Sequence, residues 1–351
     1  MSHTPDDKSA QEVCYTPEDA HDLSASCDHT DLSGQALVLE QYLSLAAGAT
    51  SNTRPRVSRI PPRRVALCGG GVRGVAHVGV MKAMRDAGLL THVREVLGIS
   101  AGSLFALLWV LEYTVDQIEK LAVQFDFNLL RNIDLDSILE FPSRYGLDDG
   151  LGLERLINSI LKQKGLPSDV TFAQMAAKFP TRFRCFATEL QTCRVRQFGT
   201  LQSPNVSVKL AIRASMSLPI FYTPVTDPET GYLLLDGGLL NNLPLVFMTE
   251  KEMIDTICVF FSRWQEDNSI PVTNMMEMFN SIYDSATILK SKPYIEKYKN
   301  NIIIVPTSDF GAMNFSEPKE HREKLITLAY KKTNEFLFTP RIQIRRRFSA
   351  T

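Results

Sequence analysis

Hydrophobic and polar positions change their pattern near residue 64 of this chain. Before it, polar and charged residues dominate. After it, short apolar runs over 65–68 and 93–97 predict buried strands, and apolar residues recurring every three or four positions over 75–87 and 101–113 predict helices. Strands that alternate with helices are typical of a parallel sheet. The pattern therefore predicts an α/β fold with a central, mostly parallel sheet between helices.

The same reasoning extends this pattern towards the C-terminus. Further helices are predicted over 115–125, 151–164, 172–179, 206–217, 274–289 and 318–338. Further strands are predicted over 182–187, 195–198, 232–235, 257–261 and 302–305, with the first two as a candidate pair. The most apolar run, 104–111, is much shorter than the ~20 residues that a membrane-spanning helix needs. No transmembrane helix is therefore predicted.

The sequence predicts four regions. Residues 1–35 carry eight acidic residues against one lysine, a net charge of −7, and such a polar stretch buries too little apolar surface to fold. We expect a disordered acidic leader there, and then a short helix and a basic linker rich in proline and arginine over 36–63. The main folded domain is expected over 64–305, and a C-terminal helix with a basic tail over 306–351.

The composition narrows the class of protein and its compartment. A formal net charge of −1 gives no general attraction to nucleic acid, so no nucleic-acid partner is predicted. The six cysteines form no C-x-x-C pair, which argues against a zinc site or a redox motif and favours free thiols in a reducing compartment. No apolar signal segment is visible near the N-terminus, and we therefore expect a cytoplasmic protein, with export by a non-Sec route left open.

The first candidate for chemistry is a serine between two glycines. Gly98-Ile-Ser100-Ala-Gly102 fits the nucleophile elbow G-x-S-x-G, with a predicted strand before it and an apolar helix after it. On so tight a turn, a Cβ at either of the two glycines would strike the neighbouring strand and helix. The N-terminus of the following helix directs its dipole at developing negative charge. Ser100 is therefore the candidate nucleophile.

A second glycine motif lies on the preceding strand-to-helix turn. It is formed by Gly69, Gly70, Gly71, Val72, Arg73 and Gly74. Consecutive glycines let backbone N–H groups point inward together, which suits an oxyanion hole. The spacing also satisfies the dinucleotide motif G-x-G-x-x-G, which expects an acidic residue at the end of the next strand. The nearest acid, Glu95, lies inside that strand instead, so the dinucleotide hypothesis is the weaker of the two.

A third element supplies a candidate base. Asp236 follows an apolar strand and precedes Gly237 and Gly238, a placement that can bring its carboxylate beside a serine on another strand. Histidine is the usual base, but His321 is the only histidine that follows Asp236, and it lies in a polar run. His77 is expected to make a structural hydrogen bond, and Asp148 with Asp149 is expected to form a turn.

These blocks, in this order, resemble the patatin-like phospholipases. That family uses a Ser-Asp dyad and an oxyanion loop of pattern G-G-G-x-[RK]-G, so Ser100 matches its nucleophile, Asp236 its aspartate and Arg73 the basic position of its loop. Residues 214–219 resemble the segment that precedes the aspartate, and 236–244 fit the family pattern D-G-G-x-x-x-N-x-P. The resemblance covers about residues 64–260 and is nearest to intracellular bacterial or viral members.

The resemblance implies a lipid acyl hydrolase, and within that class a phospholipase A that forms an acyl-serine intermediate. It implies calcium-independent chemistry with no cofactor or metal, and a phospholipid or membrane surface as substrate, with the protein associating peripherally with that surface. Activation by a protein partner is left open. Two alternatives remain: a Ser-Asp-His esterase of the α/β-hydrolase type that uses His321, and a dinucleotide-binding protein that uses the loop at 69–74.

Overall fold

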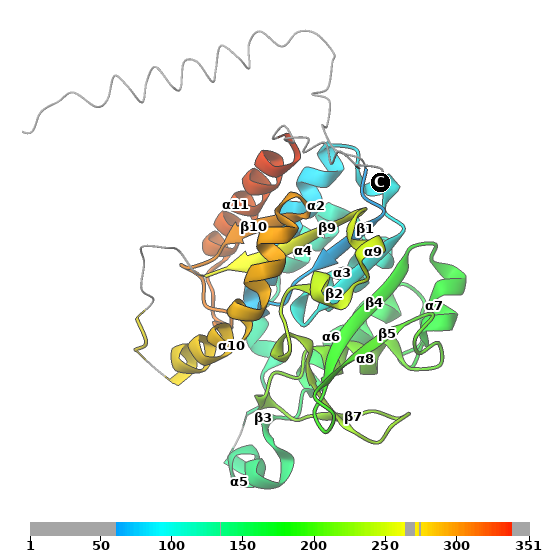
Figure 1. The fold of residues 1–351 in the computed structure, drawn as a ribbon. Helices are drawn as coiled ribbons and strands as arrows, with labels where there is room; N and C mark the ends of the chain where they lie inside the picture. The colour runs from blue at the N-terminus through cyan, green and yellow to red at the C-terminus, as the bar shows by residue number, and fades with distance from the viewer. Residues whose placement is uncertain (1–60, 134, 264–270, 274, 339–351) are drawn as a thin grey trace, which may run out of the picture. The chain divides into compact units, whose positions relative to one another are not determined.

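The computed structural model describes residues 61–338, except 134, 264–270 and 274. These residues belong to one compact unit, in which helices cover a central sheet (Figure 1). The expected acidic leader, nearly all of the proline-rich linker and the basic tail lie outside the described residues. Within the described part of the chain, no helix is both long and apolar enough to cross a bilayer.

The sheet has eight strands and is mainly parallel, as the alternation of strands and helices predicts. Its strands are β1 (Arg64–Leu67), β2 (Glu95–Ile99), β4 (Arg182–Glu189), β5 (Arg194–Gly199), β7 (Val225–Thr226), β8 (Leu233–Asp236), β9 (Thr256–Ser262) and β10 (Ile302–Pro306). The order is β10-β9-β1-β2-β4-β8-β7, and β5 also pairs with β4. The pairs from β10 to β4 are parallel. Strands β5, β7 and β8 pair antiparallel, and β4 with β5 is the pair expected from the sequence.

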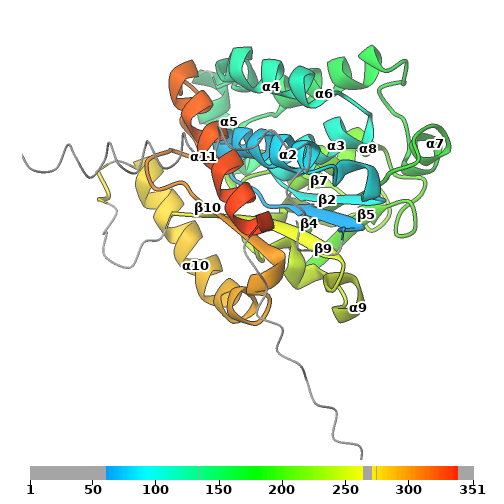
Figure 2. The same cartoon turned by 90° about the horizontal axis from the view of Figure 1, so that it is seen from above.

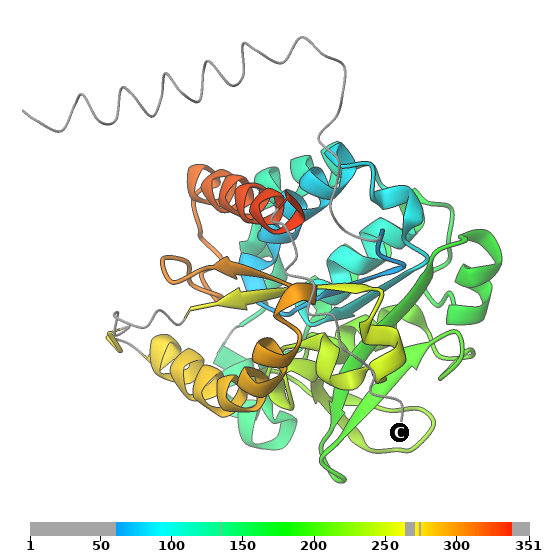
Figure 3. The same ribbon diagram turned by 45° about the horizontal axis from the view of Figure 1, so that its top comes forward.

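Helices lie on both faces of the sheet (Figure 2). The helices on one side include α2 (Ala76–Asp86), α3 (Ala101–Val110), α8 (Val208–Ser215) and α11 (Lys319–Phe338), with α4 (Val115–Gln124) and α6 (Leu151–Gln163) further out. The other side carries α9 (Glu250–Met253) and α10 (Met275–Lys297). Figure 3 shows α11, in orange-red, and α10, in yellow-orange, on opposite sides of the strands. A further helix, α7 (Phe172–Lys178), contacts β4.

The apolar core is divided by the sheet because neighbouring strand residues point to opposite faces. In β1, Val65 and Leu67 belong to the larger cluster, with α2, α3 and α8, whereas Ala66 belongs to the smaller one. In β9, Val259 belongs to the larger cluster and Cys258 to the smaller one. Burial on both faces explains why these strands are continuous apolar runs in the sequence. Helix α11 packs along α2 and therefore belongs to the larger layer.

A small substructure beside the main sheet was not predicted. It contains α5 (Leu135–Arg144) and a two-stranded parallel pair, β3 (Gly146–Asp148) with β6 (Ile220–Tyr222). The turn expected at Asp148 and Asp149 is present: Asp148 is the buried last residue of β3, and the chain turns directly after it. The Asp148 carboxylate accepts N–H bonds from Asn132 at 2.5 Å and from Gly150 at 2.7 Å. Strands of three residues are too short to show periodicity.

Candidate active site

The topology of the sheet brings the three motifs to one edge. Strands β1 and β2 are parallel neighbours, so the glycine loop after β1 and the turn after β2 leave the sheet side by side. On β4, Phe186 lies opposite Ile99, and the next residue, Ala187, lies opposite Asp236. The last residues of β2 and β8 therefore stand at the same level of the sheet, on either side of β4. This register places Ser100 near Asp236.

Ser100 occupies the strained turn that its glycine neighbours predict. Its φ is +53°, in a region that residues other than glycine rarely adopt. A Cβ at Gly98 would overlap the backbone of Gly102 and Ser103, and one at Gly102 would overlap Leu67 O. The Ser103 hydroxyl donates to Ser100 O at 2.6 Å and fixes the start of α3. The turn holds Ser100 at the N-terminus of an apolar helix.

The buried carboxylate of Asp236 lies beside the hydroxyl of Ser100, and both side chains line the same pocket. The Gly238 N–H donates to Oδ1 at 2.8 Å, and the Tyr283 hydroxyl does so at 3.4 Å. Burial raises the pKa of Asp236 from 3.8 to about 6, although these three groups oppose the rise. On the backbone side, the Thr188 hydroxyl donates to Asp236 O at 2.9 Å. A carboxylate held in this way can accept a proton from a serine near neutral pH.

Asn242 connects the two loops that flank the serine. Its side-chain oxygen accepts the Gly69 N–H at 2.8 Å, and its amide nitrogen donates to Gly69 O at 3.2 Å. The neighbouring Asn241 is buried, and its side-chain oxygen accepts from Leu243 N–H at 2.9 Å and from Ser291 Oγ at 2.8 Å. In the sequence, these asparagines belong only to the stretch 236–244 that fits the family pattern. The structure shows that Asn242 also fixes the start of the glycine loop.

The glycine loop presents two unoccupied amides. Val72 donates its N–H to Ala312 O at 2.8 Å. Arg73 donates its N–H to Gly70 O at 3.1 Å. Among the described residues, the N–H groups of Gly70 and Gly71 have no hydrogen-bond partner. Both glycines line the pocket that contains Ser100.

The Arg73 side chain ties this loop to its surroundings. Its Nε donates to Gly70 O at 3.3 Å, and its guanidinium also donates to the Thr307 hydroxyl at 3.4 Å. Burial lowers the pKa of Arg73 from its usual value, and the nearby charge of Asp284 opposes this effect. Arg73 therefore has a structural role in shaping the loop, and it also lines the pocket.

The pocket is small and mostly apolar. Its volume is about 100 Å³, and Ser100 and Asp236 lie in its wall. Apolar lining comes from Leu104, Phe105, Phe127, Leu130, Met216 and Leu218. An apolar chain fits such a lining, whereas a charged group there would lose its hydration.

The two histidines considered from the sequence, His77 and His321, lie outside this arrangement. His321 is half-exposed on α11, where its Nδ1 contacts Glu317 at 2.9 Å, and it does not line the pocket. His77 is buried, and its Nε2 bonds to Cys68 O at 2.9 Å, which is the structural role expected of it. Burial lowers the pKa of His77 to about 4. Among the described residues, no group of His, Cys, Asp and Glu side chains is arranged to hold a metal ion.

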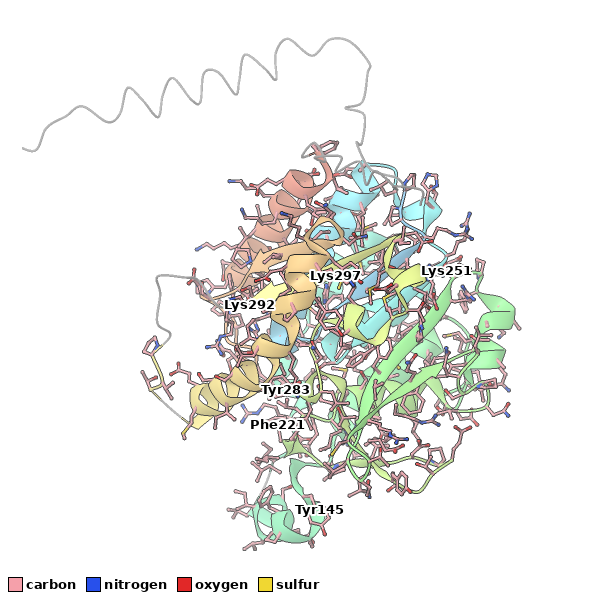
Figure 4. The ribbon with its side chains drawn as sticks, viewed as in Figure 1. Tyr145, Phe221, Lys251, Tyr283, Lys292 and Lys297 are labelled. Carbon is pink, nitrogen blue, oxygen red and sulfur yellow. The ribbon has the colours of Figure 1, made fainter. Side chains whose placement is uncertain are left out.

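Two contributors to the site were not found by sequence reasoning. Tyr283 projects from α10 towards Asp236, and Figure 4 labels it on that helix. Ser215 lies in α8, and its Oγ accepts the Ser100 N–H at 2.9 Å across the fold. Ser217, two residues further along the chain, bonds instead to Arg213 on the preceding helical turn. Contacts between residues so far apart in sequence leave no periodic signal.

Comparisons with known proteins agree with this architecture. A family model described as patatin-like phospholipase matches residues 65–248. An uncharacterized protein of Acanthamoeba polyphaga mimivirus is 24% identical over 297 residues, which cover 81% of this chain and 97% of that protein. Neuropathy target esterase sws of Drosophila grimshawi is 30% identical over 178 residues, 51% of this chain but 11% of that protein. The crystal structure of VipD from Legionella pneumophila matches with a TM-score of 0.55 at 15% identity, over 84% of this chain and 72% of that one, and shows the shared fold.

Proposed function

This chain belongs to the patatin-like phospholipase family, a family of lipid hydrolases, and we propose that it is a phospholipase A that cleaves fatty-acyl esters of phospholipids. The observation that carries the proposal is the placement of Ser100 beside the buried carboxylate of Asp236, in the wall of one apolar pocket. That arrangement pairs a serine with a base and provides an apolar place for an acyl chain.

In the first half of the proposed reaction, Ser100 Oγ attacks the ester carbonyl carbon while Asp236 accepts the hydroxyl proton. The negative charge on the carbonyl oxygen is stabilised by the free N–H groups of Gly70 and Gly71. The amides of Gly69, Val72 and Arg73 are already bonded within the fold, so the proposed oxyanion hole is narrower than the whole loop. The intermediate then collapses, and Asp236 returns its proton to the departing alcohol oxygen of the lysophospholipid.

In the second half, water attacks the carbonyl carbon of the acyl-serine. Asp236 accepts a proton from this water, and the same two amides stabilise the oxyanion. Collapse of the second intermediate breaks the bond to Ser100 Oγ, which regains a proton from Asp236 and releases the fatty acid. A carboxylate with a pKa of about 6 suits both steps, because it is ionised at neutral pH and still binds a proton readily.

The two alternatives receive less support from the geometry. A Ser-Asp-His esterase needs an imidazole beside Ser100, and His321 contacts Glu317 instead and lies outside the pocket. A dinucleotide site needs an acid at the end of β2. Glu95 stands at the start of β2, where it is paired with Arg64 and Arg184.

The proposal is tested by fatty-acid release from mixed phospholipid vesicles in the presence of a calcium chelator. We expect release of one fatty acid and one lysophospholipid per turnover, unaffected by the chelator, because the proposed reaction uses only side chains and amides of this chain. Turnover of acylglycerol emulsions but not phospholipids would reassign the substrate class. Absence of hydrolysis with any lipid ester would contradict the proposal.

A pair of glycine variants tests the role of the loop. Gly71 and Gly88 both have positive φ, +57° and +71°, so alanine at either costs about 1–2 kcal/mol of backbone strain. At Gly71 the added Cβ would also overlap Ala312 O, whereas at Gly88 nothing lies within 4 Å. We expect Gly71→Ala to lower kcat by about a hundredfold or more, because it displaces an oxyanion donor. Gly88→Ala should keep full activity. Equal activities of the two variants, with similar melting temperatures, would exclude the loop from catalysis.

A further inference from the structure

Helix α5 has its apolar side turned to solvent. Leu135, Ile138 and Leu139 are 79%, 54% and 78% exposed. Their spacing of three and four residues places them on one face of the helix. Ser137, in contrast, is buried. A helix that packed on a core would show the opposite arrangement, so this apolar face lies open in the described chain.

Two further exposed apolar side chains lie at the base of this helix. Tyr145 precedes β3, and Ile220 begins β6. Gly146 pairs with Ile220 across the two strands, which brings Tyr145 and Ile220 close together. Figure 1 shows α5 projecting from the body of the fold, and Figure 4 shows Tyr145 beside it. We call the five residues the α5 patch: Leu135, Ile138, Leu139, Tyr145 and Ile220.

The segments that carry the α5 patch are joined to residues of the pocket wall. Leu130 precedes α5 in the chain, and β3, which follows α5, pairs with β6, the strand that contains Tyr222. Both Leu130 and Tyr222 line the pocket. The Tyr222 hydroxyl donates to Leu130 O at 3.3 Å and joins the two segments. Arg213 donates to Asp149 O and to Thr223 O, both at 3.0 Å, and anchors the base of the substructure to α8.

The small volume of the pocket leaves most of a lipid molecule outside it. A volume of about 100 Å³ is well below the ~300–1,000 Å³ of sites that enclose a whole drug-sized ligand. Such a pocket holds only the part of a lipid that surrounds the reacting ester. The rest of the molecule stays outside it, where water surrounds its chains unless an apolar surface adjoins the opening.

We propose that the α5 patch is the surface by which this protein docks on a phospholipid bilayer. Its apolar side chains would enter the boundary between headgroups and acyl chains, as those of interfacial amphipathic helices do. Arg144 is the last residue of α5 and Tyr145 follows it, and both are residue types that suit this boundary. Within α5, Asp136 and Glu140 outnumber Arg144, so attraction to anionic lipid is not the source of binding. The inference rests on the proposed function for the identity of the substrate.

The test measures binding of the inactive Ser100→Ala chain to phosphatidylcholine vesicles by co-sedimentation. We expect the double variant Leu135→Ser with Leu139→Ser to lower the partition coefficient at least tenfold for each leucine, as the transfer of a leucine side chain from water predicts. Ile138→Ser with Tyr145→Ser removes the other part of the helix face and should show a similar loss. Ile254→Ser is the matched control, because Ile254 is 77% exposed but follows α9.

Activity measurements with the same substitutions in the Ser100 chain separate docking from folding. Hydrolysis of a soluble, monomeric short-chain ester should be unchanged, whereas hydrolysis of vesicles should fall with binding. Unchanged vesicle binding in both double variants, or an equal loss in the Ile254→Ser control, would overturn the proposal. So would wild-type binding confined to vesicles rich in anionic lipid, or a change of oligomeric state in place of vesicle binding, which would make the patch a protein contact. Vesicle binding through the patch without hydrolysis by wild type would sink the proposed function and leave the docking surface standing.

Discussion

Ser100→Ala should reduce fatty-acid release to the uncatalysed background, a loss of about a million-fold in kcat if chemistry limits turnover. The reason is that Ser100 is the only serine, threonine or cysteine among the described residues that line the pocket with Asp236. Alanine leaves the backbone bonds of the turn in place, including that from its own N–H to Ser215 Oγ. The fold should therefore survive the change.

Ser203→Ala provides the matched control. Ser203 is as buried as the core, and its Oγ accepts the Gly199 N–H at 3.3 Å, remote from the pocket lining. Its loss should cost about 1 kcal/mol of stability and leave kcat unchanged. Parallel initial-rate and melting measurements on both variants separate chemistry from folding. Retention of more than a small percentage of wild-type release by Ser100→Ala would remove the serine from the mechanism.

Asp236→Asn should lower kcat by about ten-thousandfold, the scale seen when an asparagine replaces the carboxylate of a Ser-His-Asp triad. The amide oxygen can still accept the Gly238 N–H, so the geometry of the turn is kept. What is lost is the ability to bind the proton of Ser100. The wild-type rate should rise with pH and level off above a pKa of about 6, because only ionised Asp236 accepts that proton. A wild-type rate that falls over this interval would contradict the assignment of Asp236 as base.

The same variant should be more stable than the wild type at pH 8. The pKa of Asp236 is 3.8 unperturbed and about 6 in the fold, so the folded protein holds this proton more tightly than the unfolded chain. That contribution to stability is complete below pH 4 and is lost as the pH rises through 6, a difference of about 3 kcal/mol. Urea denaturation at pH 4 and pH 8 should show the advantage of Asp236→Asn growing with pH by that order. An unchanged difference would mean that burial does not perturb the carboxyl group.

The motifs that could be read from the sequence are those whose geometry is set within a few residues. Gly98 and Gly102 are required by contacts inside one turn and with the adjacent strand, and the apolar strands before Ser100 and Asp236 mark where each loop leaves the sheet. Parallel pairing of β1 with β2 brings the glycine loop beside Ser100, whereas Asp236 arrives on an antiparallel strand, through a register that the sequence does not show. The fold class followed from the same alternation of strands and helices.

The parts that escaped prediction depend on residues distant in sequence. Tyr283 reaches Asp236 from 47 positions away, and Ser215 reaches Ser100 from 115 positions away. Asn242 meets Gly69 across 173 positions. Helix α5 was missed for another reason. Its apolar residues face solvent, whereas an apolar periodicity is normally interpreted as the side of a helix that packs on the core. We interpret this outward apolar stripe as the docking surface proposed above.

The most direct test of the central claim is to identify the residue that a long-chain alkyl fluorophosphonate modifies. Such a reagent mimics the ester: a serine oxygen attacks phosphorus, fluoride departs, and a stable phosphonyl-serine remains. Mass spectrometry of the digested protein should place a single adduct on Ser100, formed in step with the loss of hydrolysis and much more slowly in Asp236→Asn. Full inactivation with the adduct on another residue, or undiminished hydrolysis when Ser100 is fully modified, would contradict the account.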